Sequence, residues 1–90
     1  MYKLHLTKRF VKDAKKLKPK DIEHTMEVLE KLCKNQTLEA KYKDHALKGN
    51  WIGYRECHIR PDWILVYRIV NEKLLLVLQR TGTHSELFKK

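Results

Sequence analysis

Three of the five histidines in this chain, His45, His58 and His84, fall where the sequence predicts loops or strand ends. An imidazole with a pKa near the reference value of about 6.5 can accept or donate a proton at cellular pH. Two such groups can therefore serve a reaction that needs both a general base and a general acid. Cleavage of RNA by attack of its own 2′-hydroxyl is such a reaction, and it requires no metal ion.

Cleavage of this kind also needs cationic donors around the phosphate and surfaces that hold the bases. Arg55 and Arg80 carry forked guanidinium groups that suit phosphate. Aromatic faces on which bases can stack are offered by Trp51, Tyr54 and Trp63. Because Tyr54 and Trp63 lie in predicted strands, filling the core is an equally good explanation for them.

Other polar groups in the same region have simpler explanations. Asp62 follows Pro61 and is typical of a turn, and His58 could bond to it without catalysing anything. No neighbour marks the thiol of Cys57 as activated. A metal site is conceivable, but its ligands lack the short spacing of metal-binding motifs, so we expect no metal and no other cofactor. The ligands of that site would be His45, His58, His84 and Asp62.

Length and composition exclude several classes of protein. Ninety residues allow one compact domain, residues 1–90, and exclude a second catalytic domain. A net charge of +9 makes nucleic acid the default partner, followed by a membrane surface or an acidic protein. Cys33 and Cys57 form no disulfide framework, which favours a reducing cytosol. The longest apolar run, Leu74–Leu78, is too short to cross a bilayer and no signal peptide is evident. We therefore expect a cytoplasmic protein without membrane attachment.

Charge is distributed unevenly along the first half of the chain. Residues 1–20 hold eight Lys and Arg against Asp13 alone, whereas residues 21–40 hold two Lys against five acids. The basic segment is either a solvated lysine surface or a nucleic-acid contact, and both interpretations stay open.

The first forty residues predict a strand and two helices. Tyr2, Leu4 and Leu6 alternate with polar residues, as in a half-buried strand. Thr7 is expected to cap a short helix, which ends before Pro19. Pro19 opens a second helix with an apolar stripe. That stripe is expected to contain Ile22, Met26, Leu29 and Cys33, widened by Val28 and Leu32.

The second half of the chain predicts a loop followed by strands. Residues 35–50 show little periodicity and are expected to form a long surface loop. After Gly53 the pattern becomes typical of strands joined by tight turns. The three expected antiparallel strands cover residues 54–59, 63–70 and 73–80. Thr83 is expected to cap a final helical turn.

These elements predict an α+β fold with the order β-α-α-β-β-β. The two-helix hairpin is expected to pack on one face of a four-stranded antiparallel sheet. The other face is expected to stay open and to form a concave cationic surface suited to a single-stranded polynucleotide.

Three segments of the second half resemble a known family. They are Asp44-His45-Ala46-Leu47-Lys48-Gly49, Arg55 to Trp63 with the sequence RECHIRPDW, and Arg80 to Phe88 with the sequence RTGTHSELF. They resemble the YafQ-type branch of the RelE/ParE toxin superfamily over residues 44–88, and the first half fits its layout. The resemblance implies a RelE-like fold and a bacterial type II toxin, an endoribonuclease that cuts mRNA, commonly on the ribosome. It also implies that an acidic antitoxin holds the toxin inactive.

The resemblance also assigns candidate active-site residues. They are His45, His58, Asp62, His84 and Phe88, with Trp63 adjoining them. His84 and His58 are expected to act as general base and general acid, in either order, and His45 to carry a proton or bind phosphate. Asp62 is expected to orient and charge a neighbouring imidazole.

Five further assignments concern contact with RNA. Arg55, Arg80 and Lys48 are expected to bind phosphate, and Phe88 or Trp63 to hold a base or the backbone. Two alternatives remain open at this point. One is a non-catalytic toxin of the same fold that binds a protein such as a topoisomerase. The other is a plain nucleic-acid-binding module whose basic helix contacts phosphate.

Overall fold

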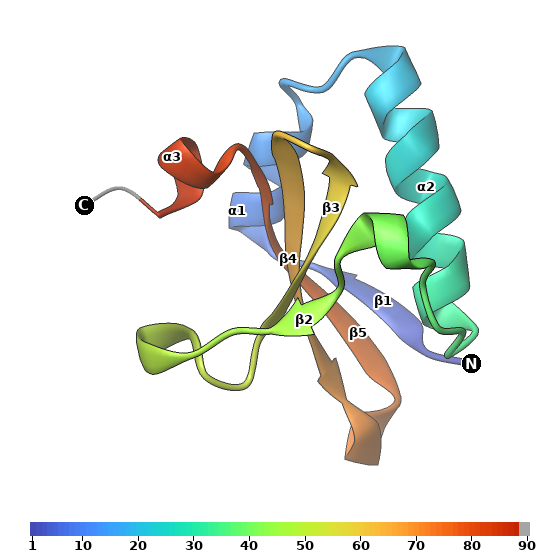
Figure 1. Ribbon diagram of the computed structural model, residues 1–90. Coiled ribbons are helices and arrows are strands. Elements are labelled where there is room, and N and C mark those ends of the chain that lie inside the picture. Colours follow the sequence, from blue (N-terminus) through green and yellow to red (C-terminus); the bar gives the residue numbers. More distant parts are fainter. Residues whose placement is uncertain (89–90) are drawn as a thin grey trace.

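The computed structural model describes residues 1–88 and has the expected α+β class, with a sheet between helix α2 on one side and helix α3 on the other (Figure 1). The strands are β1 (Lys3–Leu6), β2 (His45–Ala46), β3 (Arg55–Arg60), β4 (Trp63–Val70) and β5 (Leu75–Gly82). The α-helices are α1 (Lys8–Ala14), α2 (Pro19–Cys33) and α3 (His84–Leu87), and the 3₁₀ turns are η1 (Ala40–Tyr42), η2 (Gly49–Trp51) and η3 (Asn71–Lys73). None of the helices in the described residues is long and apolar enough to cross a membrane.

The sheet has five strands in the order β1-β5-β4-β3-β2, not the four antiparallel strands expected. Strands β3, β4 and β5 form the expected antiparallel meander. β1 instead runs parallel to β5, with Lys3 opposite Leu75 and Leu6 opposite Leu78. The antiparallel prediction is wrong for β1 because a hairpin fixes strand direction, whereas the long connection between β1 and β5 permits either direction. β2 lies inside the segment predicted as a loop, since two residues show no periodicity.

Both long helices pack on one face of the sheet, as expected. The core on this helix side contains Phe10, Val28, Leu29, Leu32, Leu38, Tyr42, Cys57, Ile59, Leu65, Tyr67, Leu76 and Leu78. The buried stripe of α2 is rotated from the predicted one, because Thr25 is buried while Ile22 and Met26 are 44% and 57% exposed. Burial of Thr25 is tolerated because its hydroxyl donates to the carbonyl oxygen of Asp21 at 2.7 Å.

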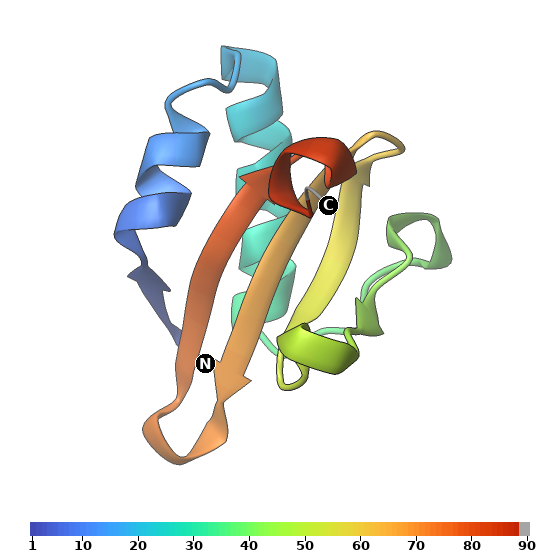
Figure 2. The same cartoon turned by 90° about the vertical axis from the view of Figure 1, so that its left-hand side faces the viewer.

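The opposite face of the sheet is covered in part. A smaller cluster there contains Ile64, Val66 and Leu87, packed against the half-buried Leu47, Trp51, Tyr54 and Phe88. The prediction of an open face is therefore wrong near these residues. The reason is that α3 and the segment between β2 and β3 lie in front of this face, as Figure 2 shows.

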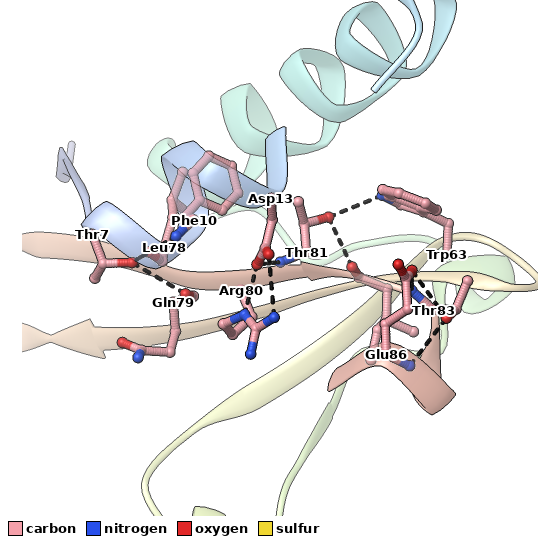
Figure 3. Close-up of polar contacts among 11 residues, drawn as sticks. Thr7, Phe10, Asp13, Trp63, Leu78, Gln79, Arg80, Thr81, Thr83 and Glu86 are labelled. Atoms are coloured by element: carbon pink, nitrogen blue, oxygen red, sulfur yellow. Dashed lines mark hydrogen bonds and ion pairs between the residues drawn. The ribbon is translucent and has the colours of Figure 1, made fainter. Parts of the chain in front are cut away.

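Thr7 connects two elements, α1 and β5, through one hydroxyl group (Figure 3). Its Oγ1 accepts a hydrogen bond from the N–H of Phe10 at 3.1 Å and thus caps α1 as expected. The same hydroxyl donates toward the carbonyl oxygens of Leu78 and Gln79 in β5, at 2.9 and 3.1 Å. One side chain therefore ties the start of α1 to β5.

Thr7→Ala is expected to lower the free energy of unfolding by about 1–2 kcal/mol, because it removes the cap and the bond to β5 together. Urea denaturation of the parent and variant measures this difference. The exposed Thr37 provides the control, since Thr37→Ala should change the free energy by less than about 0.5 kcal/mol. Equal midpoints for Thr7→Ala and the parent would contradict the prediction.

Candidate active site

One buried carboxylate gathers three imidazole groups on the face of the sheet opposite α1 and α2. β3 directs Glu56 and His58 to this face, because residues two apart in a strand share a face and Cys57 between them belongs to the helix-side core. The Glu56 side chain is 5% exposed. Its Oε2 lies 3.0 Å from Nε2 of His84, 3.4 Å from Nε2 of His45 and 3.7 Å from Nε2 of His58. We call these four residues the Glu56 cluster.

His45 reaches the cluster from the short strand β2. In the sheet it lies opposite Glu56, and Ala46 lies opposite Arg55. Nδ1 of His45 lies 2.6 Å from the carbonyl oxygen of Lys43, whose backbone is left-handed with a φ of 48°. Both ring nitrogens therefore have a partner, while half of the side chain stays exposed.

His84 is the first residue of α3 and is positioned by a capping box. Oγ1 of Thr83 accepts from the N–H of Glu86 at 3.2 Å, and the N–H of Thr83 donates to Oε1 of Glu86 at 3.1 Å. These hydrogen bonds from Thr83 lower the pKa of Glu86, so the cap persists into acidic solution. The box thus fixes the backbone from which the His84 ring extends over the sheet.

The acceptors around each imidazole indicate which of its nitrogens carry protons. A backbone carbonyl and an ionised carboxylate can only accept, so a ring nitrogen that faces either one must be a donor. His45 faces an acceptor at both nitrogens, and so does His58, whose Nδ1 lies 3.2 Å from the carbonyl oxygen of Pro61. His84 meets Glu56 through Nε2, and within residues 1–88 nothing bonds to its Nδ1, which is free to accept a proton.

Aromatic side chains flank the cluster on one side. Trp51 packs edge-to-face with Tyr54 and Phe88, at centroid distances of 5.5 and 5.3 Å. The Phe88 ring lies 5.8 Å from the ring of His84. Trp63 packs instead against the helix-side core, and its Nε1 donates to a threonine of β5 at 2.9 Å. Of the predicted stacking residues, Phe88 is therefore the one beside a catalytic candidate.

Arg80 is held at the edge of β5 by an acid of α1. Its Nε and Nη2 donate to the two carboxylate oxygens of Asp13 at 2.6 and 3.2 Å, and the backbone N–H of Thr81 adds a bond of 3.1 Å (Figure 3). The bond to Asp13 raises the pKa of Arg80. Val66 of β4 lies opposite Arg80 on one side and Glu56 on the other, so one strand separates this cation from the cluster.

A cavity of about 330 Å³ opens beside this ion pair, and Arg9, Lys16 and Trp63 also line it. Among the other predicted phosphate ligands, Arg55 lies 3.4 Å from the carboxylate of Asp44 and is 39% exposed. Lys48 is exposed at the start of η2. These cations are therefore not gathered at one point, because Arg55 alternates with Glu56 in β3 and meets Asp44 on the helix side, away from the cluster.

The acid that lies beside the imidazole groups is one that sequence reasoning missed. Asp62 is exposed in the turn between β3 and β4 and, within residues 1–88, forms no hydrogen bond or ion pair with an imidazole, so its catalytic role stays a prediction. Glu56 lies within 3.7 Å of three imidazole nitrogens. The signal was its spacing of two from His58 in a predicted strand, which places both side chains on one face. Cys57 is fully buried and burial raises its pKa to about 12, which excludes it as a nucleophile.

Part of the cluster also has the geometry of a metal site. Glu56, His58 and His84 each offer one ligand atom, and these atoms lie within 4.8 Å of one another. Two imidazole nitrogens and a carboxylate oxygen suit Zn²⁺ or Cu²⁺. Sequence reasoning named His58 and His84 among conceivable metal ligands but offered Asp62 as the acid, whereas the structure places Glu56 beside them.

Comparison with known proteins identifies sequence relatives of this chain. Residues 2–89 match a family described as "Bacterial toxin of type II toxin-antitoxin system, YafQ". The mRNA interferase toxin YafQ of Escherichia coli strain B / BL21-DE3 is 44% identical over 84 residues, which cover 89% of this chain and 88% of that protein. The toxin of the same name from strain K12 is 55% identical over 51 residues, which are 57% of this chain and about half, 53%, of that relative.

Solved structures give the same result. A metal-bound toxin from Helicobacter pylori superposes with a TM-score of 0.88 at 40% identity, covering 98% of this chain and 100% of that chain. YafQ in the E. coli DinJ-YafQ complex superposes with a TM-score of 0.83 at 39% identity, covering 98% and 99% of the two chains. The family match extends over nearly all of the chain and agrees with the fold. This chain therefore belongs to the YafQ family of bacterial toxins of type II toxin–antitoxin systems.

Proposed function

We propose that this toxin is an endoribonuclease that cleaves mRNA by attack of the 2′-hydroxyl, without a metal ion in the reaction. The observation that carries the proposal is the Glu56 cluster, in which three imidazole nitrogens lie within 3.7 Å of one carboxylate oxygen. The name mRNA interferase toxin, borne by both E. coli relatives, supports mRNA as the substrate. The same names do not favour the alternative of a non-catalytic toxin that binds a topoisomerase.

His84 is the general base in this proposal. Its Nε2–H donates to Glu56 at 3.0 Å, and the carboxylate stabilises the positive charge that develops when Nδ1 accepts the proton of the 2′-hydroxyl. Half of the His84 side chain is exposed, so a ribose can approach Nδ1. The 2′-oxygen then forms a bond to the adjacent phosphorus while the bond from phosphorus to the 5′-oxygen breaks.

His45 is the general acid that protonates the departing 5′-oxygen. Its side chain is 50% exposed whereas that of His58 is 15% exposed, so His45 is the more accessible of the two for contact with a departing oxygen. His58 is enclosed beside Glu56 and helps to shape the site. The products are a 2′,3′-cyclic phosphate and a 5′-hydroxyl, and His84 and His45 have exchanged protonation states.

The neighbouring groups position the RNA in this proposal. Phe88 packs beside His84 and can stack on a base next to the scissile bond. Arg80, held beside the cationic cavity of about 330 Å³, suits a flanking phosphate, since one strand separates it from Glu56. Lys48 can bind a further phosphate along the RNA. Arg55 meets Asp44 on the helix side, so a phosphate contact by Arg55 stays a prediction.

The metal-bound toxin from H. pylori raises the question of an ion at this site. Glu56, His58 and His84 fit such an ion by their donor atoms and spacing. An ion bound there would supply Lewis-acid polarisation of a phosphate oxygen. Coordination would also occupy imidazole nitrogens that the acid–base route uses to hold and move protons. We therefore assign metal binding to an inhibited form of the enzyme.

Partners follow from charge and from the comparisons. YafQ of E. coli forms a complex with DinJ, which supports an antitoxin partner for this chain. The net charge of +9 favours an acidic antitoxin and attraction to ribosomal RNA at a translating ribosome. We also propose that the toxin acts on mRNA in the cytoplasm.

End-group analysis of cleaved RNA tests the proposed reaction, using purified toxin with and without ribosomes. We expect a cyclic or 3′-phosphate and a 5′-hydroxyl, because the 2′-oxygen is the nucleophile. Cleavage should persist in EDTA and should slow when Zn²⁺ is added. A 3′-hydroxyl product, or activity that EDTA abolishes and a divalent ion restores, would show that a metal-activated water is the nucleophile.

A further inference from the structure

A partly buried hydrogen bond joins β4 to the residue that precedes His45. The Tyr67 phenol donates to Oδ1 of Asp44 at 2.5 Å, and Tyr67 is only 1% exposed. Nε of Arg55 lies 3.4 Å from the same oxygen. Because Tyr67 lies opposite Arg55 in the sheet, two neighbouring strands meet this carboxylate from one side. Tyr67 belongs to the helix-side core and is not part of the Glu56 cluster.

Asp44 and His45 point to opposite faces of the sheet. Successive side chains alternate between the faces of an extended backbone. Asp44 meets Tyr67 on the helix side, whereas His45 meets Glu56 on the other side. A rotation of this segment about its own axis would move both side chains together. The contact that fixes Asp44 therefore also fixes the direction of the His45 ring.

β2 is too short to hold His45 by itself. It contains two residues at the edge of the sheet and pairs with β3 alone. Lys43, two residues before His45, has a φ of 48°, which is disfavoured for a lysine and persists only when its surroundings hold it. Downstream of β2, the N–H of Leu47 donates to the carbonyl oxygen of Tyr54 at 2.9 Å. Upstream, the anchor is the carboxylate of Asp44.

We infer that Asp44, held by the hydroxyl of Tyr67, is a positioning residue for His45. The inference rests on the proposed RNA cleavage, in which His45 protonates the leaving oxygen. Asp44 touches neither substrate nor transferred proton, and acts by keeping the imidazole over Glu56. A displacement of about 1 Å at a catalytic group can cost about a hundredfold in rate.

The phenol keeps its donor role throughout the pH range of an assay. Burial, followed by the hydrogen bond and the charge of Asp44, raises the pKa of Tyr67 well above its usual value. The side chain of Asp44 is 24% exposed, so the carboxylate is screened from most of the solvent. Ionisation of the phenol therefore does not break the contact in an assay near neutral pH.

Tyr67→Phe tests the inference, because it removes one oxygen atom and leaves the ring in the core. We expect kcat for RNA cleavage to fall by about 10–100-fold with little change in KM. In ¹H–¹⁵N spectra the imidazole signals of His45 should shift, while those of His84 stay in place. Asp44→Ala should resemble Tyr67→Phe, and the double variant should cost no more than the larger single loss, because both remove one interaction. Asp44→Asn keeps an acceptor oxygen and should retain most of the activity.

Tyr2→Phe is the matched control. Its phenol also donates one hydrogen bond, to Oδ1 of Asn71 at 2.9 Å, but that contact ties β1 to the turn before β5 and not to β2. This variant should keep parental kcat and His45 signals. A folded Tyr67→Phe with parental kcat and unshifted His45 signals would overturn the inference, and so would equal shifts at His45 and His84. If the parent cleaves no RNA, the proposed function fails, whereas the His45 spectra still decide the positioning role.

Discussion

His84→Gln is expected to lower kcat for RNA cleavage by about 10²–10⁴-fold, the range for loss of a general base. Glutamine keeps an N–H group that can donate to Glu56, where Nε2 of His84 now lies 3.0 Å from Oε2. It offers no nitrogen that accepts a proton, so the 2′-hydroxyl loses its base while the shape of the site is kept. Single-turnover cleavage of a defined RNA measures the loss, and induction in growing cells measures the loss of toxicity.

His5→Gln is the control for this experiment. His5 is exposed on β1, two strands beyond β4 in the sheet and away from the Glu56 cluster. It should leave kcat and toxicity at the parental level. High concentrations of imidazole should restore part of the activity of His84→Ala, because half of the His84 side chain is open to solvent. Parental cleavage by His84→Gln would remove His84 from the reaction.

Glu56→Gln is expected to reduce cleavage by about 10²–10⁴-fold, comparable with the loss when an acid that orients a catalytic imidazole is made neutral. The substitution keeps the size of the side chain but removes the charge that three imidazole groups share. His84 then loses stabilisation of its protonated form, and the cation of His45 loses its counter-ion. Single-turnover rates give the loss of activity, and thermal denaturation gives the effect on stability.

Stability should change much less than activity. Glu56 is 4% exposed, and a neutral amide of equal size removes both the cost of dehydrating the carboxylate and its attraction to His84, so the two effects on the melting temperature should largely cancel. Glu30→Gln provides the control, because Glu30 is exposed and pairs with Lys34 at 2.9 Å. It should change neither quantity appreciably. A Glu56→Gln variant that loses activity only in proportion to lost folding would assign Glu56 a purely structural role.

Turns, strand bounds and helix caps depend on neighbouring residues, and the sequence was sufficient to predict them. The turn residues Pro61-Asp62 and Asn71-Glu72 indicate two hairpins. The strand between them, β4, has the predicted bounds of residues 63–70. Thr7 and Thr83 were recognisable as caps because a cap is defined by its immediate neighbours. The buried face of α2 could not be recognised in this way. Ile22 with Met26, and Thr25 with Val28, both have helical spacing, so either pair could have faced the core. A hydroxyl bonded to its own helix decided in favour of burying Thr25.

Some residues of the candidate site could be predicted from the sequence and others could not. Histidines are conspicuous in a sequence, and the structure brings His45, His58 and His84 together. Glu56 is inconspicuous, because an acid in a predicted strand normally faces water. Its burial is possible only after α3 and β2 have brought imidazole groups to it. Contacts between such distant segments leave no periodic trace, so the orienting acid could be located only in the folded chain.

Pairing of β1 with β5 has a consequence for biosynthesis. A growing polypeptide displays β1 among its first residues, yet β1 has no neighbouring strand until residues 75–82 have left the ribosomal exit tunnel. His84 follows β5 in the chain, so the Glu56 cluster is incomplete at the moment when β1 first gains its neighbouring strand. The candidate site therefore cannot assemble on a nascent chain that still lacks β5.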